Sequence, residues 1–168
     1  IEQANTEIMT TAPGSATTMI AIEINGRQIR SFHIGDSVAL VIGQRGKIKY
    51  QTIPHSPVGY AVEAGLLEQD DAMQHDERHL ISNVVGSEEM RIEIGPLMTL
   101  AKRDTLLVAS DGLFDNLTID EIVDIMRCGP LARAATQLVN ICKDRMGQQR
   151  EGELHKPDDL SLMLYRNQ

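Results

Sequence analysis

The first third of the chain carries apolar and β-branched runs that are separated by tight turns. Residues 17–24 are rich in Ile and Thr, and Asn25-Gly26 follows, a dipeptide that tolerates the positive φ angles of a hairpin turn. Residues 27–34 predict the returning strand, and the runs at 38–42 and 47–52 predict two more. The pattern therefore predicts an antiparallel meander of about four strands with one face that needs cover.

The pattern changes after this meander. Residues 55–76 contain short apolar clusters broken by glycines, which predict short helical pieces in an irregular insertion. Residues 91–94 and 105–109 predict two more strands, and residues 160–165, which alternate Leu with Ser, Met and Tyr, predict a closing strand.

Two amphipathic helices are predicted between these last strands. Thr118 and Glu121 have the spacing of a capping box, and the apolar residues that follow recur at i, i+3, i+4 and i+7. Gly129-Pro130 ends this helix, which spans residues 118–127, and residues 131–146 carry a second apolar stripe. The two stripes need a shared apolar surface, so we expect both helices to pack along one face of the sheet.

The order of the elements predicts an α+β fold of antiparallel β-sheets covered by α-helices. The length, 168 residues, suits a single domain spanning residues 1–168. Because Ile122 and Leu138 lie on the two apolar stripes, this fold requires both side chains to be buried.

Composition excludes some classes of partner. The formal net charge is −8, and no basic stripe offsets it, so nucleic acid is a poor partner. The longest aliphatic run, residues 38–42, is far too short to span a bilayer, so we expect no membrane partner. Cys128 and Cys142 lack a CxxC spacing and are expected to be reduced core residues of a cytoplasmic protein. The acidic surplus itself fits either a solvated surface or carboxylates gathered around cations.

Three aspartates stand where strands begin or end. Asp36 lies in a turn between two predicted strands, Asp111 follows the strand at 105–109, and Asp158 precedes the closing strand. Strand ends can bring distant positions together, and a carboxylate cluster without a Cys or His pair suits Mg²⁺ or Mn²⁺. The alternative for each residue is an ordinary turn aspartate that bonds its own backbone.

Six segments decide between these alternatives because they form an ordered series: Gly14-Ser15-Ala16-Thr17, His33-Ile34-Gly35-Asp36-Ser37, Thr52-Ile53-Pro54-His55-Ser56, residues 77–86, Val108-Ala109-Ser110-Asp111-Gly112-Leu113-Phe114-Asp115 and Lys156-Pro157-Asp158-Asp159-Leu160-Ser161. Together they resemble the bacterial form of the protein phosphatase 2C family of metal-dependent serine/threonine phosphatases. The resemblance covers residues 14–166 and implies a β-sandwich of the phosphatase 2C type. Pro54 stands where that family has an aspartate.

The resemblance implies roles for the three aspartates. Asp111 and Asp158 match ligands on one side of a two-metal centre that holds Mn²⁺ or Mg²⁺. Asp36 matches an aspartate that, with Asp111, can hold a third and weaker metal. The metals would activate a water for in-line attack on phosphorus, and the partner would be a protein phosphorylated on serine or threonine.

The sequence also departs from the family pattern. Neither an Arg with nearby acidic residues nor an Asp-Gly-His-Gly turn is found, and no His-Gly dipeptide occurs. The chain is therefore expected to be the C-terminal part of a longer enzyme, with an incomplete sandwich and a poor activity of its own. The alternative is a non-catalytic phosphatase-like binding or regulatory module. Protein substrate, pathway and oligomeric state stay open.

Smaller roles follow for neighbouring residues. His33 is expected to be a hydrogen-bonded strand residue, and His155 a loop residue for which metal ligation is the weaker of two interpretations. Asp115 is expected to brace the Asp111 loop. Asp159 alternates with Asp158 along the chain, so we expect it to point to the opposite side and to have a structural role.

Overall fold

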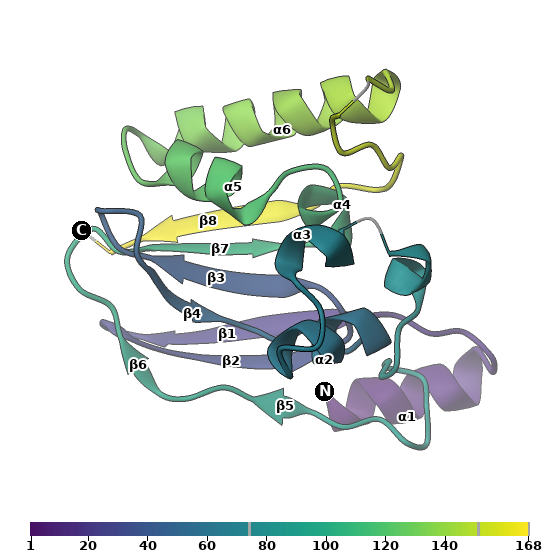
Figure 1. Cartoon of the computed structure of the whole chain (residues 1–168). Helices are drawn as coiled ribbons and strands as arrows, with labels where there is room; N and C mark the ends of the chain where they lie inside the picture. Colours follow the sequence, from purple (N-terminus) through teal and green to yellow (C-terminus); the bar gives the residue numbers. More distant parts are fainter. Residues whose placement is uncertain (74, 151, 168) are drawn as a thin grey trace. The chain divides into compact units, whose positions relative to one another are not determined.

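The computed structural model describes residues 1–73, 75–150 and 152–167. The chain divides into two compact units. The first comprises Ile1–Ser37 and Thr52–Met98, and the second comprises Val38–Gln51 and Thr99–Gln168. Antiparallel strands and helices occur in both (Figure 1), so the predicted α+β class is confirmed.

The first unit is centred on a β-hairpin. β1 (Met19–Asn25) pairs with β2 (Gln28–Ile34), and the short β5 (Glu93–Ile94) pairs with the other edge of β2. β6 (Met98–Thr99), at the boundary of the units, also pairs with β2. Gly26 has a φ of 59° in the two-residue turn, so the predicted Asn25-Gly26 hairpin is confirmed.

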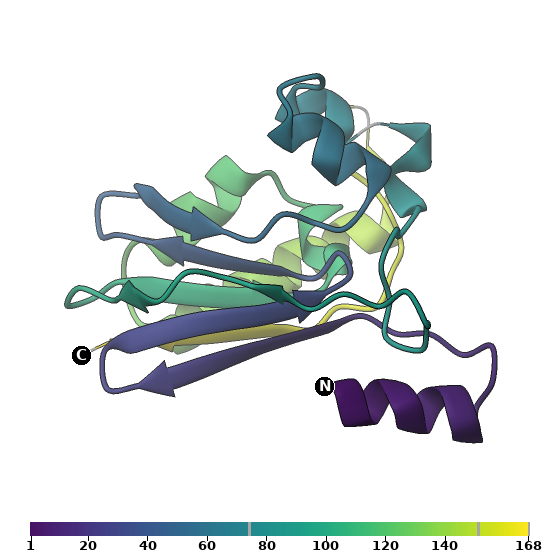
Figure 2. The same ribbon diagram turned by 90° about the horizontal axis from the view of Figure 1, so that it is seen from below.

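Helices complete the first unit. They are α1 (Glu2–Thr11), α2 (Pro57–Glu63), α3 (Gln69–Ala72) and the 3₁₀ helix η1 (Asp76–His79). The last three gather into one group (Figure 2). α2 and α3 are the short helical pieces predicted for residues 55–76, whereas η1 begins at the last residue of that range. Ser56 caps the start of α2, because its Oγ accepts a 2.9 Å hydrogen bond from the Gly59 backbone N–H.

The second unit contains a four-stranded antiparallel sheet in the order β4-β3-β7-β8. Its strands are β3 (Val38–Ile42), β4 (Ile48–Gln51), β7 (Thr105–Ala109) and β8 (Leu162–Arg166). Its helices are α4 (Asp111–Phe114), α5 (Ile119–Met126) and α6 (Leu131–Gly147). Figure 1 shows α5 and α6 along one side of β7 and β8.

The core of the second unit lies between this sheet and the helices. Leu40 of β3 and Leu107 of β7 meet Ile122 of α5 and Leu138 of α6, and all four side chains are fully buried. Leu160, Leu162 and Leu164 pack against the same cluster, as the alternation of the closing strand predicts. The prediction that both helices pack along one face is therefore confirmed.

Polar contacts fix the two helices to each other. Thr118 and Glu121 form the predicted capping box at the start of α5. The Glu121 carboxylate also accepts two hydrogen bonds from Arg145 of α6, of 2.6 and 3.0 Å. This ion pair holds the pKa of Glu121 below its usual value.

Two predictions are wrong. β3 does not continue the β1-β2 meander but pairs with β4 and β7 in the sheet of the second unit. All five of its residues are buried, and an uninterrupted apolar run is stable as a central strand, covered on both faces. Cys128 is exposed because it lies after the last turn of α5, whereas Cys142 is buried as expected.

Helix length and composition also bear on the membrane prediction. Among the helices of the described residues, none is both long enough and apolar enough to cross a bilayer.

Candidate metal centre

Asp111 is positioned by the end of β7. This buried strand is followed by Ser110 in extended conformation, and Asp111 opens the short helix α4. The next residue, Gly112, is buried, and a Cβ built on it would lie 2.4 Å from the backbone oxygen of Asp159. Glycine is therefore required here, because only a residue without a side chain lets the segment of Asp158 pass so close to Asp111.

β8 brings the second aspartate to the same place. β7 and β8 are antiparallel, with Ala109 opposite Leu162, so the residues before β8 lie beside those that follow β7. The Ser110 backbone N–H donates to the Ser161 carbonyl at 3.0 Å, and the Ser161 N–H donates to Ser110 Oγ at 3.1 Å. This pairing fixes the register of the two aspartate-bearing segments.

The buried amide of Asn116 links the two segments that carry Asp111 and Asp158. Asn116 is fully buried, and its Nδ2 donates to the carbonyls of Gly112 and Lys156, both at 2.9 Å. Its Oδ1 accepts from the Lys156 backbone N–H at 3.0 Å. Asn116 thus ties the loop before Asp158 to the helix that carries Asp111, across 40 residues of sequence.

Three carboxylates converge as a result. Asp111, Asp115 and Asp158 each offer an oxygen atom, and these atoms lie within 4.8 Å of one another. Lys156 lies among them: its Nζ is 3.6 Å from Asp111 Oδ2 and 3.4 Å from Asp158 Oδ2, and it hydrogen-bonds to Asp115 Oδ2.

The charges of this cluster are unbalanced. Burial raises the pKa of Asp111, and the negative charge of Asp158 raises it further, while Lys156 opposes the shift. Burial by itself lowers the pKa of Lys156, but its hydrogen bond to Asp115 and the three carboxylates outweigh burial and raise it. The cluster holds three carboxylates but only one ammonium, so it carries an excess of negative charge. Carboxylate oxygens are hard ligands, which suit a divalent cation such as Mg²⁺ or Mn²⁺.

Asp36 belongs to the first unit, where it follows β2. The preceding Gly35 has a φ of 102°, and a Cβ on it would lie 2.4 Å from the Thr18 side chain. The Gly35 N–H donates to His55 Nδ1 at 3.1 Å, and the His55 N–H donates to the Gly35 carbonyl at 3.0 Å. These contacts fix the turn that carries Asp36, while a pairing of Asp36 with Asp111 of the other unit stays a prediction.

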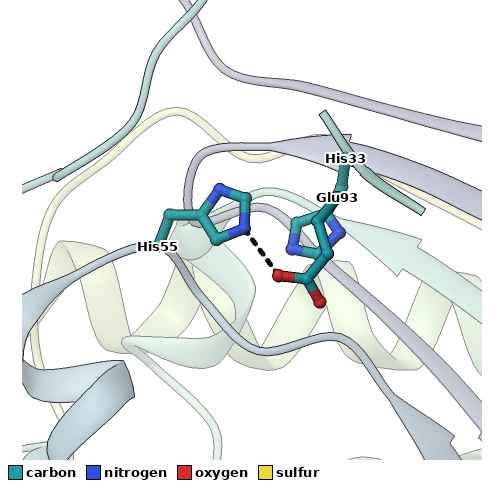
Figure 3. A group of neighbouring side chains, drawn as sticks. All are labelled: His33, His55 and Glu93. Atoms are coloured by element: carbon teal, nitrogen blue, oxygen red, sulfur yellow. Dashed lines mark hydrogen bonds and ion pairs between the residues drawn. The ribbon is translucent and has the colours of Figure 1, made fainter. Parts of the chain in front are cut away.

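A second group of candidate ligands lies in the first unit, formed by His33, His55 and Glu93 (Figure 3). His55 Nδ1 must accept from the Gly35 N–H, so its Nε2 carries the proton and donates to Glu93 at 3.1 Å. The His33 and His55 rings stack with centroids 4.4 Å apart, and His33 Nε2 and both nitrogens of His55 already take part in hydrogen bonds. These hydrogen bonds compete with metal ligation, so the carboxylate cluster of the second unit is the better candidate.

Its histidines are instead structural. His33 Nε2 donates to the Ile53 carbonyl at 3.0 Å, as expected for a hydrogen-bonded strand residue. Burial lowers the pKa of His33, so this ring is neutral at pH 7. His55 is buried and also contacts the Asn83 amide at 2.9 Å.

Comparison with known proteins identifies the family of the chain. Residues 2–154 match the family model described as Protein phosphatase 2C. The chain belongs to this family.

Individual proteins that are similar to this chain are phosphatases as well. Protein phosphatase PhpP of Streptococcus pneumoniae serotype 2 is 33% identical over 137 residues, which cover 80% of this chain and 54% of that protein. The S. agalactiae serine/threonine phosphatase has a TM-score of 0.78 and 25% identity, over 99% of this chain and 67% of that one. The PstP catalytic domain, solved in complex with 2 manganese ions, has a TM-score of 0.73 and 22% identity, over 96% and 64%. At that identity the likeness to PstP shows the fold alone.

This member of the protein phosphatase 2C family spans about half the length of the curated relatives it matches. Of the aspartates predicted from its motifs, Asp111 and Asp158 come together in the second unit. Asp159 donates its backbone N–H to Asp158 Oδ1 at 2.8 Å, a contact within the loop. The His155 ring donates from Nδ1 to the Arg145 carbonyl at 2.5 Å, which ties it to α6.

Three residues of the centre cannot be assigned to a cluster from the sequence motifs. The sequence predicts only that Asp115 braces the loop, and it predicts no role for Lys156 or Asn116. The motif spacing offers a signal only for Asp115, because this residue lies one helical turn after Asp111.

Proposed function

We propose that this chain supplies part of the catalytic centre of a metal-dependent serine/threonine protein phosphatase. Its substrate would be a protein phosphorylated on serine or threonine, and its cofactor Mn²⁺ or Mg²⁺, with two ions and a third, weaker one. The observation that carries the proposal is the convergence of Asp111 and Asp158 at the paired ends of β7 and β8. The cytoplasmic location expected from the sequence stays a prediction.

The residues of the second unit would have distinct tasks. Asp111 and Asp158 would present carboxylate oxygens to one side of the centre, and Asp36 would contribute from the first unit. Asn116 and the Ser110–Ser161 pair keep the two aspartate segments in register, which fixes where the oxygens stand before any ligand arrives. When bound, the ions would supply Lewis-acid catalysis and activate water for attack on phosphorus.

Hydrolysis of a phosphothreonine peptide tests the proposal. We expect the product of the complete reading frame that contains this chain to release phosphate with Mn²⁺ and to stop with EDTA. The 168-residue chain alone is expected to be at least about a hundredfold slower, because it lacks the Asp-Gly-His-Gly turn and so leaves charge on the reacting phosphoryl group uncompensated.

PhpP serves as the positive control for the peptide and the metal. If the folded product of the complete reading frame releases no phosphate under conditions in which PhpP does, the enzyme proposal is wrong and the binding-module alternative stands. If the short chain is as fast as that product, the argument from the missing turn is wrong.

A further inference from the structure

Lys156 occupies a built position inside the carboxylate cluster. Its backbone N–H and carbonyl are both bound by the buried Asn116 amide, so the side chain starts from a fixed point. Its Nζ reaches three carboxylates at once, and only 22% of the side chain is exposed. Fixing the long side chain of a lysine costs rotamer entropy. The contacts of Lys156 with the three carboxylates must offset this cost.

The ammonium and a divalent cation would need the same space. Nζ lies 3.6 Å from Asp111 Oδ2 and 3.4 Å from Asp158 Oδ2, next to the oxygens that would bind the ion. A second cation entering there would be repelled by the lysine, because the two charges would lie well within the Debye length of each other. The two positive groups are therefore alternatives at this pair of carboxylates.

Asp115 is the carboxylate with which Lys156 can stay paired when a cation binds. It makes the shortest of the three contacts with Nζ, and only 15% of its side chain is exposed. The flexible four-carbon stem of lysine lets the ammonium turn toward one partner without moving the backbone. Lys156 can thus stay paired with Asp115 while Asp111 and Asp158 are freed.

We propose that Lys156 is an internal counter-ion that neutralises the Asp111–Asp158 pair in the metal-free chain and must withdraw from it before a divalent cation binds. Lys156 then sets the metal affinity of the centre and keeps its carboxylates assembled when metal is scarce. This inference rests on the proposed function, since it concerns the regulation of the same site.

Titration of the 168-residue chain with Mn²⁺, followed by calorimetry, tests the proposal. Lys156→Met keeps the length of the stem and removes the charge, and Lys156→Gln is a second variant with a polar end. We expect both to bind Mn²⁺ about tenfold more tightly than the unaltered chain, because the competing charge is gone. Lys102→Met, at an exposed turn residue before β7, controls for the change in net charge and is expected to leave the affinity unchanged within about twofold.

Thermal melting gives an independent measurement on the same proteins. Without metal, the Lys156 variants are expected to melt at lower temperature than the unaltered chain, because three carboxylates lose their counter-ion. With Mn²⁺ their melting temperature is expected to rise by more than that of the unaltered chain.

The outcomes separate this inference from the proposed function. If the unaltered chain binds Mn²⁺ and neither Lys156 variant binds it more tightly, the counter-ion inference is overturned and the metal centre stands. If only the Lys156 variants bind Mn²⁺ measurably, the inference is supported. If no variant binds Mn²⁺, both the inference and the metal centre are wrong.

Discussion

Replacing Asp158 or Asp111 with Asn is expected to weaken Mn²⁺ binding by this chain at least about tenfold. Each substitution keeps the shape of the side chain and removes one of the charges that hold the cation. The amide can still accept the hydrogen bonds that Asp111 Oδ1 receives from Gly112 and Asp158 Oδ1 receives from Asp159. The effect should therefore fall on binding and leave the fold of the loops intact.

The control is the same substitution at an aspartate outside the cluster. Asp124 lies on α5 with a side chain that is 71% exposed, and its ion pair is with Arg127. Asp124→Asn is expected to bind Mn²⁺ as the unaltered chain does. Equal losses of affinity in all three variants would contradict a specific site and indicate a diffuse effect of net charge.

Asp111→Asn is expected to weaken Mn²⁺ binding but not to lower the stability of the metal-free chain. Because burial and Asp158 raise the pKa of Asp111, its ionised form is less favourable in the folded than in the unfolded chain at pH 7. Asparagine removes this penalty, and the gain is small because 37% of the side chain is exposed to screening solvent. A metal-free melting temperature at or slightly above that of the unaltered chain is the expected result.

The largest expected effect on stability is that of Leu138→Ala. Leu138 is fully buried on α6, in the core between the helices and the sheet of the second unit. The substitution removes the carbons beyond Cβ, so the free energy gained by transferring them from water into the core is lost and a cavity is left. The free energy of unfolding should therefore fall by about 3–4 kcal/mol. Chemical denaturation followed by circular dichroism measures this change.

Leu66→Ala is the matched control, since Leu66 is 82% exposed. Its unfolding free energy should change by less than about 0.5 kcal/mol. A loss of under about 1 kcal/mol for Leu138→Ala would contradict the described packing of α6 on the sheet.

Local features of the fold could be predicted because their physics is local. The Asn25-Gly26 turn needs positive φ, and the capping box of Thr118 and Glu121 lies within one helical turn. The partners of β3 could not be predicted in the same way. A period of two assigns residues to the faces of a strand but does not say which strand lies beside it.

In the candidate site, too, the sequence predicts the residues that stand in local motifs and not those whose role depends on distant contacts. Asp111 and Asp158 could be found because each stands in a motif at a strand end. Asn116 and Lys156 could not, because their role depends on hydrogen bonds and charges between residues about 40 positions apart. In the sequence alone, Lys156 resembles any lysine of a polar loop.

Anomalous diffraction at the manganese edge, from crystals of this chain grown with Mn²⁺, tests the central claim most directly. The account predicts a peak within about 2.5 Å of an oxygen of both Asp111 and Asp158, with Lys156 Nζ turned toward Asp115. Bound Mn²⁺ at other residues only, or no peak at saturating Mn²⁺ while Lys156 still bridges Asp111 and Asp158, would contradict it.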